Sequence, residues 1–439
     1  MAVTLEYQGP TGLVDSSGAL SSRAAAEAFL GGVCFKLGPP TLIGAELEWL
    51  TVQGECPASD PLSAPRPRVS ALAAALGPHA PPSLASGSPA LPLPGGSRVT
   101  VEPGGQIELS SDPFGTATEL CDNLRADARL LDELLAVAGI RTVARAADAD
   151  RGADRLLRSP RYRAMERSFA GIGPFGKLMM CNTAATQVSV DAGADTGEVA
   201  ARWRMLYAAG PALVAAFACS PALHGAPPGA WASQRMRTWL RLDTARTRPP
   251  VQDWADPISG YARWALDVPL LCLRRPDDAE ARTVPGCPDW SPPPGATFAD
   301  WLSGALDDEV GRRPGTDDLR YHLTTLFPQV RASGYFEIRY LDAQPGEDWT
   351  VPIHLFDALL SSPSTVAEAT ALADPTAEQW SHTARCGLAD PEIRAVAAAL
   401  LDLAAAHART PEATADLGAA ARRCRAGRTP TDEPIRALS

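Results

Sequence analysis

The stretch from residue 98 to residue 111, RVTVEPGGQIELSS, constrains the fold most, because it joins a chain reversal to an apparent strand. Its Pro-Gly-Gly segment favours a tight turn and lets the backbone pass close to a neighbouring group. Glu102 comes directly before the turn. After it, Glu108 lies on one face of an extended strand, while Ile107 and Leu109 lie on the other. Taken alone, the stretch predicts a hairpin corner with a solvated polar face.

Three further stretches show the same alternation of polar and apolar residues. Their polar faces carry Glu46 and Glu48 in residues 41–52, Gln187, Ser189 and Asp191 in residues 178–192, and Tyr335, Glu337 and Arg339 in residues 334–342. Four such strands, scattered over much of the chain, pair most simply in a mostly antiparallel sheet. Helices would then cover the apolar face of that sheet.

Five glutamates would gather on the polar face of this sheet: Glu46, Glu48, Glu102, Glu108 and Glu337. Like charges that face each other across strands are destabilising, and none of the four strands carries a lysine to offset them. A hard divalent cation is the simplest compensation. Magnesium prefers oxygen ligands and commonly joins carboxylates to nucleotide phosphates. The pattern therefore predicts magnesium-assisted phosphoryl transfer.

Apolar periodicity predicts several helices around the sheet. They cover residues 22–31, 69–77, 116–138, 151–168 and 395–408. The nearly uncharged run of residues 207–223 contains Gly210 and Pro211 and is shorter than the roughly 20 residues that a membrane span needs. We interpret that run as a buried helix.

Residues 171–177, GIGPFGK, match the opening of a phosphate-binding loop but lack its context. No strand-like segment precedes them, and Leu178 stands where such a loop needs a Ser or Thr hydroxyl for magnesium. Residues 233–249 contain five arginines, whose planar forks can bind carboxylate or phosphate at two points. For most of these arginines we expect a solvated loop.

The net charge of −11 argues against nucleic acid as a partner, since phosphate backbones require a basic surface. The nine cysteines form no C-x-x-C pair, and the first residues lack a basic start and an apolar core. We therefore expect reduced thiols, a cytoplasmic location and no membrane partner. Residues 1–425 are predicted to form a single catalytic domain, with a core at 35–360 and a helical part at 365–425. Residues 426–439 are predicted to form a flexible tail.

Five blocks occur in one order between about residues 35 and 360: TVEPGGQIELS, MMCNTAATQVSVD, SQRMRTWLRLDTARTRP, YARWALDVPL and YHLTTLFPQVRASGYFEIRYLD. Together they resemble glutamate-cysteine ligases of the plant-like and bacterial branch, and most closely the ergothioneine-pathway members of actinobacteria. The resemblance implies an α+β, glutamine-synthetase-like fold with a cupped, mostly antiparallel six-stranded sheet flanked by helices. It also implies ATP-dependent joining of the γ-carboxylate of L-glutamate to the amino group of L-cysteine. The products would be γ-glutamylcysteine, ADP and phosphate, formed through γ-glutamyl phosphate.

The resemblance also assigns roles to individual residues. Six of them would hold two or three Mg²⁺ ions: Glu46, Glu48, Glu102, Glu108, Gln187 and Glu337. Gln187 stands where other bacterial members have a histidine ligand, and an amide oxygen can also bind magnesium. Arg339 would neutralise the transferred phosphoryl group of ATP. Arg235 matches an arginine that holds substrate carboxylate, Arg246 lies in a similar position of the same block, and Tyr162 resembles a tyrosine near the acceptor amino acid.

Two other hypotheses remain open on the sequence. The enzyme could join glutamate to another small amine, because the sequence does not show the shape of the acceptor pocket. Alternatively, the chain could be a catalytically silent protein that binds a nucleotide or an amino acid on the same fold. The intact set of acidic residues argues against a silent protein, since such a protein would be free to lose carboxylates that repel one another.

Overall fold

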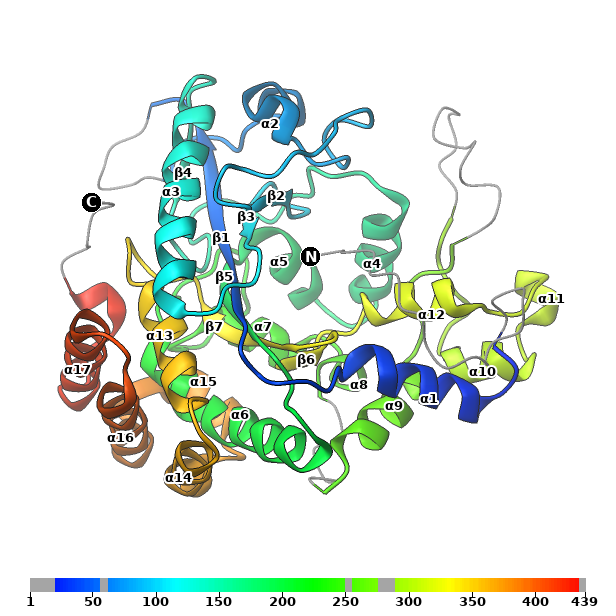
Figure 1. Ribbon diagram of the computed structural model, residues 1–439. Coiled ribbons are helices and arrows are strands. Elements are labelled where there is room, and N and C mark those ends of the chain that lie inside the picture. Colours follow the sequence, from blue (N-terminus) through cyan, green and yellow to red (C-terminus); the bar gives the residue numbers. More distant parts are fainter. Residues whose placement is uncertain (1–19, 56–61, 249–254, 275–288, 434–439) are drawn as a thin grey trace.

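The computed structural model describes residues 20–55, 62–248, 255–274 and 289–433 (Figure 1). A seven-stranded open sheet lies at its centre, with the order β2-β3-β1-β5-β7-β6 and with β4 paired to β1. The strands are β1 Ile43–Gln53, β2 Arg98–Val101, β3 Ile107–Ser110, β4 Ile140–Val143, β5 Ala185–Val190, β6 Val330–Ala332 and β7 Phe336–Asp342. All paired strands are antiparallel. The predicted mostly antiparallel sheet is confirmed, and β4 adds a seventh strand to the six that were expected.

Seventeen α-helices surround the sheet in the described part of the chain. The first eight are α1 Arg23–Cys34, α2 Val69–Leu76, α3 Ala117–Ala136, α4 Pro160–Ala170, α5 Phe175–Asn182, α6 Thr196–Phe217, α7 Gln234–Arg241 and α8 Thr244–Thr247. The others are α9 Pro257–Asp267, α10 Phe298–Ser303, α11 Asp307–Val310, α12 Thr316–Leu323, α13 Thr350–Leu359, α14 Pro363–Ala373, α15 Trp380–Cys386, α16 Pro391–His407 and α17 Pro411–Arg425.

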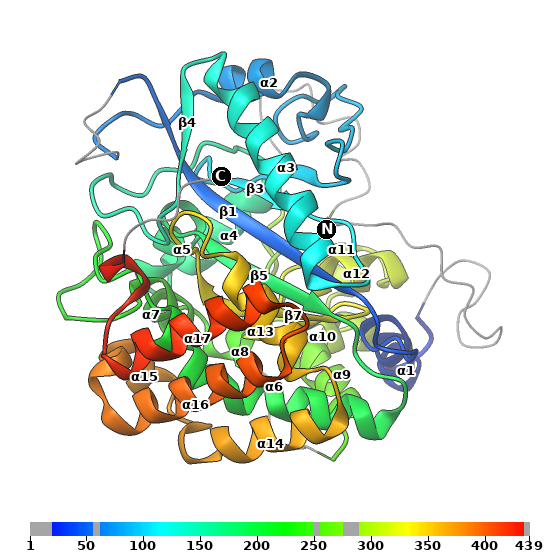
Figure 2. The same ribbon diagram turned by 60° about the vertical axis from the view of Figure 1, so that its left-hand side comes forward.

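The two faces of the sheet have different surroundings. Helices α3, α6 and α13 pack against the strands, and their apolar side chains join Leu47, Leu109, Val188 and Ile338 in one large core. In Figure 1, α3 and α13 lie to the left of the strands, whereas α4 and α5 lie to the right. Figure 2 shows the C-terminal helices α14, α16 and α17 stacked beneath the sheet. The polar face therefore looks toward α4 and α5, on the side away from the main core.

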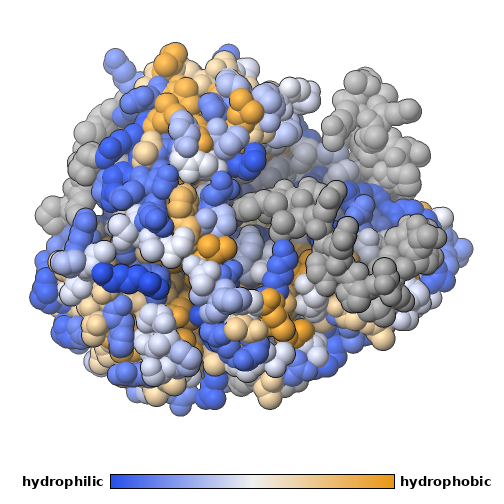
Figure 3. Space-filling model, in the orientation of Figure 1, coloured by the Kyte–Doolittle hydropathy of each residue, from blue (hydrophilic) through white to orange (hydrophobic). Residues whose placement is uncertain are grey.

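Helix α6 confirms the buried helix expected from the apolar run over residues 207–217, whereas residues 218–223 lie beyond its end. Asp195 caps its first turn by accepting a hydrogen bond from the backbone N–H of Glu198, and nearly all later residues are buried. A Cβ added at Gly210 would lie 2.1 Å from the ring of Trp380, so this glycine allows the two to pack closely. No helix in the described ranges is both long enough and apolar enough to cross a membrane. On the face shown in Figure 3, hydrophobic residues form small groups among hydrophilic ones.

Several predicted boundaries were wrong. Residues 178–182 belong to α5 and not to the following strand, because Met180 and Cys181 pack into a small core with Phe169 of α4. Helix α4 begins only at Pro160, since a residue that precedes proline is disfavoured in helical conformation and Ser159 caps the helix instead. Helix α1 continues past the glycines at which it was expected to end.

The C-terminal segment was also predicted incorrectly in part. Residues 426–433, expected within a flexible tail, form a turn at Gly427 and a short 3-10 helix, Pro430–Asp432. Asp432 accepts hydrogen bonds from the backbone N–H and the hydroxyl of Thr429, which closes this short helix. Residues 434–439 lie outside the described residues.

Candidate active site

A cavity of about 200 Å³ lies on the polar face of the sheet. The strands and the turn after β2 contribute Glu46, Glu48, Glu102, Glu108 and Gln187 to its wall. Helices contribute the opposite wall, including Arg161, Tyr162, Met180, Arg235 and Trp239. The cavity therefore brings together five of the six predicted metal ligands, one predicted substrate arginine and the predicted acceptor tyrosine.

Strand register explains why the acidic side chains meet. Glu46 of β1 lies opposite Gln187 of β5, and Glu48 of β1 lies opposite Glu108 of β3. Side chains that face each other across antiparallel strands have Cβ atoms only about 5 Å apart. Thr100 of β2 lies on the far side of Glu108 and donates its hydroxyl hydrogen to that carboxylate. The register thus places one polar ladder across the four strands β2, β3, β1 and β5, with its three carboxylates on β1 and β3.

Burial and mutual repulsion dominate the electrostatics of these carboxylates. Burial, and next the charges of Glu102 and Glu108, raise the pKa of Glu48 well above its ordinary value. Burial also raises the pKa of Glu46, Glu102 and Glu108, and neighbouring carboxylates add to each shift. This cluster is therefore stabilised by positive charge or by protons.

Gln187 supplies an observation that fits a cation. Its Nε2 donates to Glu46 Oε2 at 3.1 Å and to Glu48 Oε1 at 2.9 Å, while its buried Oε1 has no hydrogen-bond partner among the described residues. An amide oxygen without a partner beside several carboxylates is a donor set that suits magnesium. Within the described ranges, no three carboxylate, imidazole or thiol groups already converge at metal-binding spacing. The donors fit the ion chemically, and its binding would draw them together.

Glu337, the sixth predicted ligand, does not line the cavity. It is completely buried, and Arg331 donates to both of its oxygens, from Nε to Oε2 at 2.7 Å and from Nη2 to Oε1 at 2.8 Å. Arg339 Nη1 also donates to it. Although burial raises the pKa of Glu337, Arg331 and Arg339 outweigh that effect and bring it to about 2. The carboxylate of Glu337 already has two cationic partners, so it does not need a metal ion to balance its charge. A metal role for Glu337 stays a prediction.

Arg331 is a residue that sequence reasoning missed. It lies directly opposite Glu337 in the pairing of β6 with β7, and it also lines the cavity. The four predicted strands carry no lysine, but Arg331 offsets the charge of Glu337 from β6, a strand that the alternation of residues did not identify. The signal was available, since the sequence VRASGYFEI predicts a tight hairpin that pairs this arginine with the glutamate.

The predicted catalytic and substrate arginines lie side by side. Arg339 lines the cavity from β7, and its carbonyl oxygen accepts a hydrogen bond of 2.7 Å from Arg235 Nη2. Both guanidinium groups lie over the ring of Trp239, at 5.6 Å for Arg339 and 6.0 Å for Arg235. Arg235 is on the first turn of α7, where Ser233 caps the helix. This pair forms a cationic wall beside the carboxylates.

Arg246 lies outside the cavity wall. Its side chain is 1% exposed and donates to Asp243 Oδ2 at 3.2 Å, to the Thr325 carbonyl at 2.9 Å and to the Pro269 carbonyl at 2.6 Å. These contacts occupy all three nitrogens of the guanidinium group. The geometry therefore favours a structural role for Arg246, and its assignment as a substrate ligand stays a prediction.

Arg161 is a further cavity residue that the sequence did not single out. It donates to both the hydroxyl and the carbonyl of Thr324, each at 2.8 Å, and lies next to Tyr162 at the start of α4. Burial raises the pKa of Tyr162. His322 is buried outside this wall, and burial lowers its pKa to about 4.

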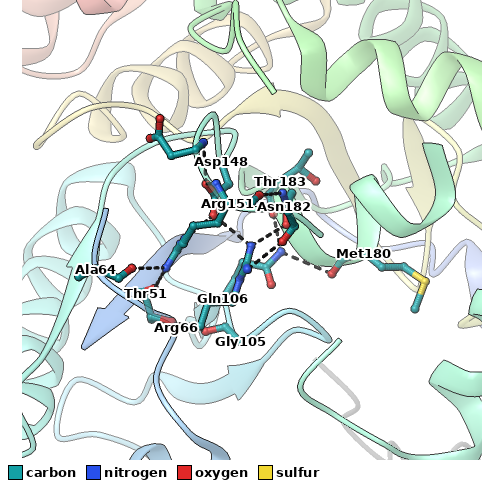
Figure 4. A network of polar contacts seen from close by, with 12 residues as sticks. Thr51, Ala64, Arg66, Gly105, Gln106, Asp148, Arg151, Met180, Asn182 and Thr183 are labelled. Carbon is teal, nitrogen blue, oxygen red and sulfur yellow. Dashed lines mark hydrogen bonds and ion pairs between the residues drawn. The ribbon is translucent and has the colours of Figure 1, made fainter. Parts of the chain in front are cut away.

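A hydrogen-bond network behind the cavity holds the turn that carries Glu102 (Figure 4). Thr51 donates its hydroxyl hydrogen to the Gly105 carbonyl at 2.6 Å, and Gln106 Nε2 donates to the Thr183 carbonyl at 2.8 Å. Deeper in the network, buried Asp148 forms ion pairs with two arginines, at 3.1 Å to Arg66 and 2.7 Å to Arg151. Arg151 also donates to the carbonyls of Thr51 and Ala64. The turn is therefore anchored to β1 and to the end of α5.

Gly104 makes this anchoring possible, and its replacement gives a first prediction. A Cβ at Gly104 would lie 2.2 Å from the carbonyl oxygen of Cys181, a contact that forces the backbone apart. We expect Gly104→Ala to lower the free energy of unfolding by about 1–3 kcal/mol, as overpacking does. Turnover should fall as well, because the turn carries Glu102. Urea unfolding and steady-state kinetics would measure the two effects.

Gly87→Ala is the matched control for this change. A Cβ at Gly87 meets nothing within 4 Å, so this variant should behave like the wild type. Equal stability of the two alanine variants would show that the turn does not pack against α5 as described.

A second prediction concerns magnesium and pH. Raised carboxylate pKa values stabilise the fold below the ordinary value of 4.5, and that contribution is lost as the pH rises through the raised values. Magnesium would compensate the charge that appears. We therefore expect the increase in melting temperature caused by magnesium to grow between about pH 5 and pH 8. Melting curves with magnesium or a chelator, at equal ionic strength, test this, and an increase that is independent of pH would contradict it.

Comparisons with known proteins identify the family of this chain. The model of the family described as glutamate-cysteine ligase family 2 (GCS2) matches residues 42–437. Glutamate–cysteine ligase EgtA of Mycolicibacterium smegmatis is 40% identical over 320 residues, which are 72% of each chain. The chloroplastic glutamate–cysteine ligase of Medicago truncatula is 31% identical over 258 residues, which are 57% of this chain and 48% of the relative.

A solved structure shares the fold. The glutamate–cysteine ligase (gshA) of Francisella tularensis, solved in complex with AMP, aligns with a TM-score of 0.52 at 13% identity, over 90% of this chain and 84% of that one. The family match extends through the sheet, the cavity wall and the C-terminal helices. The chain therefore belongs to glutamate-cysteine ligase family 2.

Proposed function

We propose that this protein joins the γ-carboxylate of L-glutamate to the amino group of L-cysteine with ATP as co-substrate, giving γ-glutamylcysteine, ADP and phosphate. The observation that carries this proposal is the cavity itself, in which four carboxylates and an amide face a wall of arginines. The 40% identity to two proteins named glutamate–cysteine ligase EgtA supports the same reaction. The resemblance of the sequence blocks supports a further part of this proposal, that the product enters ergothioneine biosynthesis in the cytoplasm.

The residues of the chain divide the work between two sides of the cavity. When bound, Mg²⁺ neutralises charge on the ATP phosphates; Glu46, Glu48, Glu102, Glu108 and Gln187 would hold it, and two or three ions are our proposal for the number. Arg339 points into the cavity and would contact the phosphoryl group as it leaves ADP. Arg235, beside it, would hold a carboxylate of glutamate. The arginines thus place opposite charge around an anionic reaction centre.

The reaction then depends on the positioning of the substrates more than on a protein nucleophile. The glutamate γ-carboxylate attacks the terminal phosphorus of ATP and forms γ-glutamyl phosphate, while ADP leaves. The cysteine amine attacks the carbonyl carbon of this mixed anhydride, and phosphate leaves with the bonding electrons. No cysteine, serine or histidine is among the residues that line the cavity in the described part of the chain. Tyr162, with the methionines of α4 and α5, would contact the acceptor amino acid.

One assay separates this proposal from its alternatives. Purified protein is supplied with magnesium, ATP and glutamate, and ADP release is measured with cysteine or with alanine, serine, 2-aminobutyrate or glycine as acceptor. We expect strong turnover with cysteine and weak turnover with the other amines. Equal or better turnover with another amine would identify a ligase of different acceptor specificity. No turnover with any amine would favour a silent binding protein.

A further inference from the structure

Cys386, His382 and Asp390 form a hydrogen-bonded row in the C-terminal helical part, outside the cavity wall. Cys386 Sγ lies 3.7 Å from His382 Nδ1, and His382 Nε2 lies 2.9 Å from Asp390 Oδ2. The His382 side chain is 49% exposed and that of Asp390 is 25% exposed. The cysteine is partly exposed. A thiol, an imidazole and a carboxylate in this order are the parts of an activated nucleophile.

The local sequence builds the row. His382 and Cys386 are four residues apart on α15, so their side chains lie on the same face of the helix. Gly387 ends the helix with a φ of 55°, a left-handed conformation that favours glycine. The short 3-10 turn that follows brings Asp390 back over His382. A Cβ at Gly387 would lie 2.6 Å from Cβ of Ala232, which gives a second reason for glycine at this turn.

Asp390 orients the imidazole of His382 through a hydrogen bond. One of its oxygens caps α16 by accepting hydrogen bonds from the backbone N–H groups of Glu392 and Ile393, at 2.9 and 3.1 Å. Its other oxygen faces His382, and the hydrogen bond from that imidazole lowers the pKa of Asp390. In the tautomer that donates Nε2–H to this carboxylate, Nδ1 is the acceptor toward the thiol.

The other described cysteines are in different environments. Cys34, Cys121, Cys181, Cys272 and Cys424 are buried, and burial raises the pKa of each thiol. Cys219 is partly exposed by surface area, but its thiol donates to the Ala343 carbonyl at 3.2 Å and burial raises its pKa well above the usual range. Within the described part of the chain, Cys386 alone combines exposure with an imidazole acceptor.

We propose that Cys386 is an activated thiol that forms mixed disulfides with small disulfides such as cystine. In the first step the thiol proton moves to His382 Nδ1, and the thiolate attacks one sulfur of cystine. A new disulfide forms between Cys386 and half of the cystine while the original disulfide breaks. The departing cysteine thiolate takes the proton back from His382, so that cystine is the oxidant and one free cysteine is released. The adduct is covalent, and its formation does not depend on the ligase reaction.

The test measures the rate at which cystine modifies the protein. Cys56 and Cys287 lie outside the described residues, so both are first changed to serine in all samples. In this background we compare the unchanged site with His382→Ala, Asp390→Asn and the control His407→Ala, which removes an exposed histidine from α16. Asparagine still caps a helix, so Asp390→Asn tests the carboxylate charge without removing the cap. Intact-mass spectra give the rate, and peptide mapping gives the position.

We expect the adduct to map to Cys386. Its rate of formation should fall about tenfold in His382→Ala and severalfold in Asp390→Asn, since the thiolate is the nucleophile and the imidazole produces it. His407→Ala should react like the unchanged site. Melting curves check that each variant is folded. Modification of another cysteine, or an unchanged rate in His382→Ala, would overturn the proposal.

Discussion

Replacing Glu108 with glutamine is expected to abolish most ligase activity while leaving the fold intact. Glu108 is 7% exposed, lies opposite Glu48 and accepts hydrogen bonds from the hydroxyls of Thr100 and Ser110. The glutamine oxygen can accept both of these bonds, so the local packing survives. The charge that would bind magnesium is lost. We expect turnover to fall by about a hundredfold or more, the equivalent of roughly 3 kcal/mol of transition-state stabilisation.

The same change should act on stability in the opposite direction. Burial and the neighbouring carboxylate of Glu102 raise the pKa of Glu108, which means that its charge is unfavourable in the folded protein without metal. Removing the charge should therefore raise the melting temperature of the magnesium-free protein. It should also reduce the additional stabilisation that magnesium provides.

Glu368→Gln is the matched control for Glu108→Gln, since Glu368 is exposed on α14 and outside the cavity wall. Turnover and magnesium dependence equal to the wild type in Glu108→Gln would contradict the placement of the metal site. A fall in activity together with loss of the folded state would instead point to a structural role for this carboxylate.

The sequence predicted the strand faces better than it predicted the walls around them. Strict alternation in β1 and β3 identified Glu46, Glu48 and Glu108, because an extended backbone fixes which side chains share a face. It did not identify Arg161 or Trp239, which reach the cavity from helices whose positions depend on tertiary packing. No local pattern contains that information.

Other differences between the sequence predictions and the structure have equally specific causes. Helix α5 was taken as strand because its apolar residues show no clear period, and only packing against α4 decides the matter. Arg246 was assigned by resemblance alone, and resemblance does not reveal that three neighbours already hold its guanidinium group. His382 and Cys386 were visible at helical spacing, but the approach of Asp390 depends on the left-handed turn at Gly387.

Arg331 and Arg339 both bind Glu337, and their replacement is expected to have different effects. Loss of Arg331 should mainly lower stability, and loss of Arg339 should mainly lower turnover. Arg331 contacts both oxygens of the fully buried carboxylate, so Arg331→Met leaves a buried charge with one cation, Arg339. Loss of one partner of a buried ion pair costs about 3–5 kcal/mol. We expect this variant to unfold at clearly lower urea concentration than the wild type.

Arg339→Met should show the opposite balance. Glu337 keeps its two-point contact with Arg331, so the loss of stability is expected to be smaller than in Arg331→Met. The Arg339 guanidinium has one nitrogen, Nε, that is buried without a hydrogen-bond partner in the described part of the chain, and its charge lies over Trp239 at the cavity wall. If this group contacts the phosphoryl group in the transition state, kcat should fall about a thousandfold, the lower range for an arginine in such a position.

ADP release at saturating substrates and urea unfolding measure both variants. Wild-type turnover in Arg339→Met would show that Arg339 has no role in the reaction. Equal stability of the two variants would contradict the conclusion that Arg331 stabilises Glu337 more than Arg339 does.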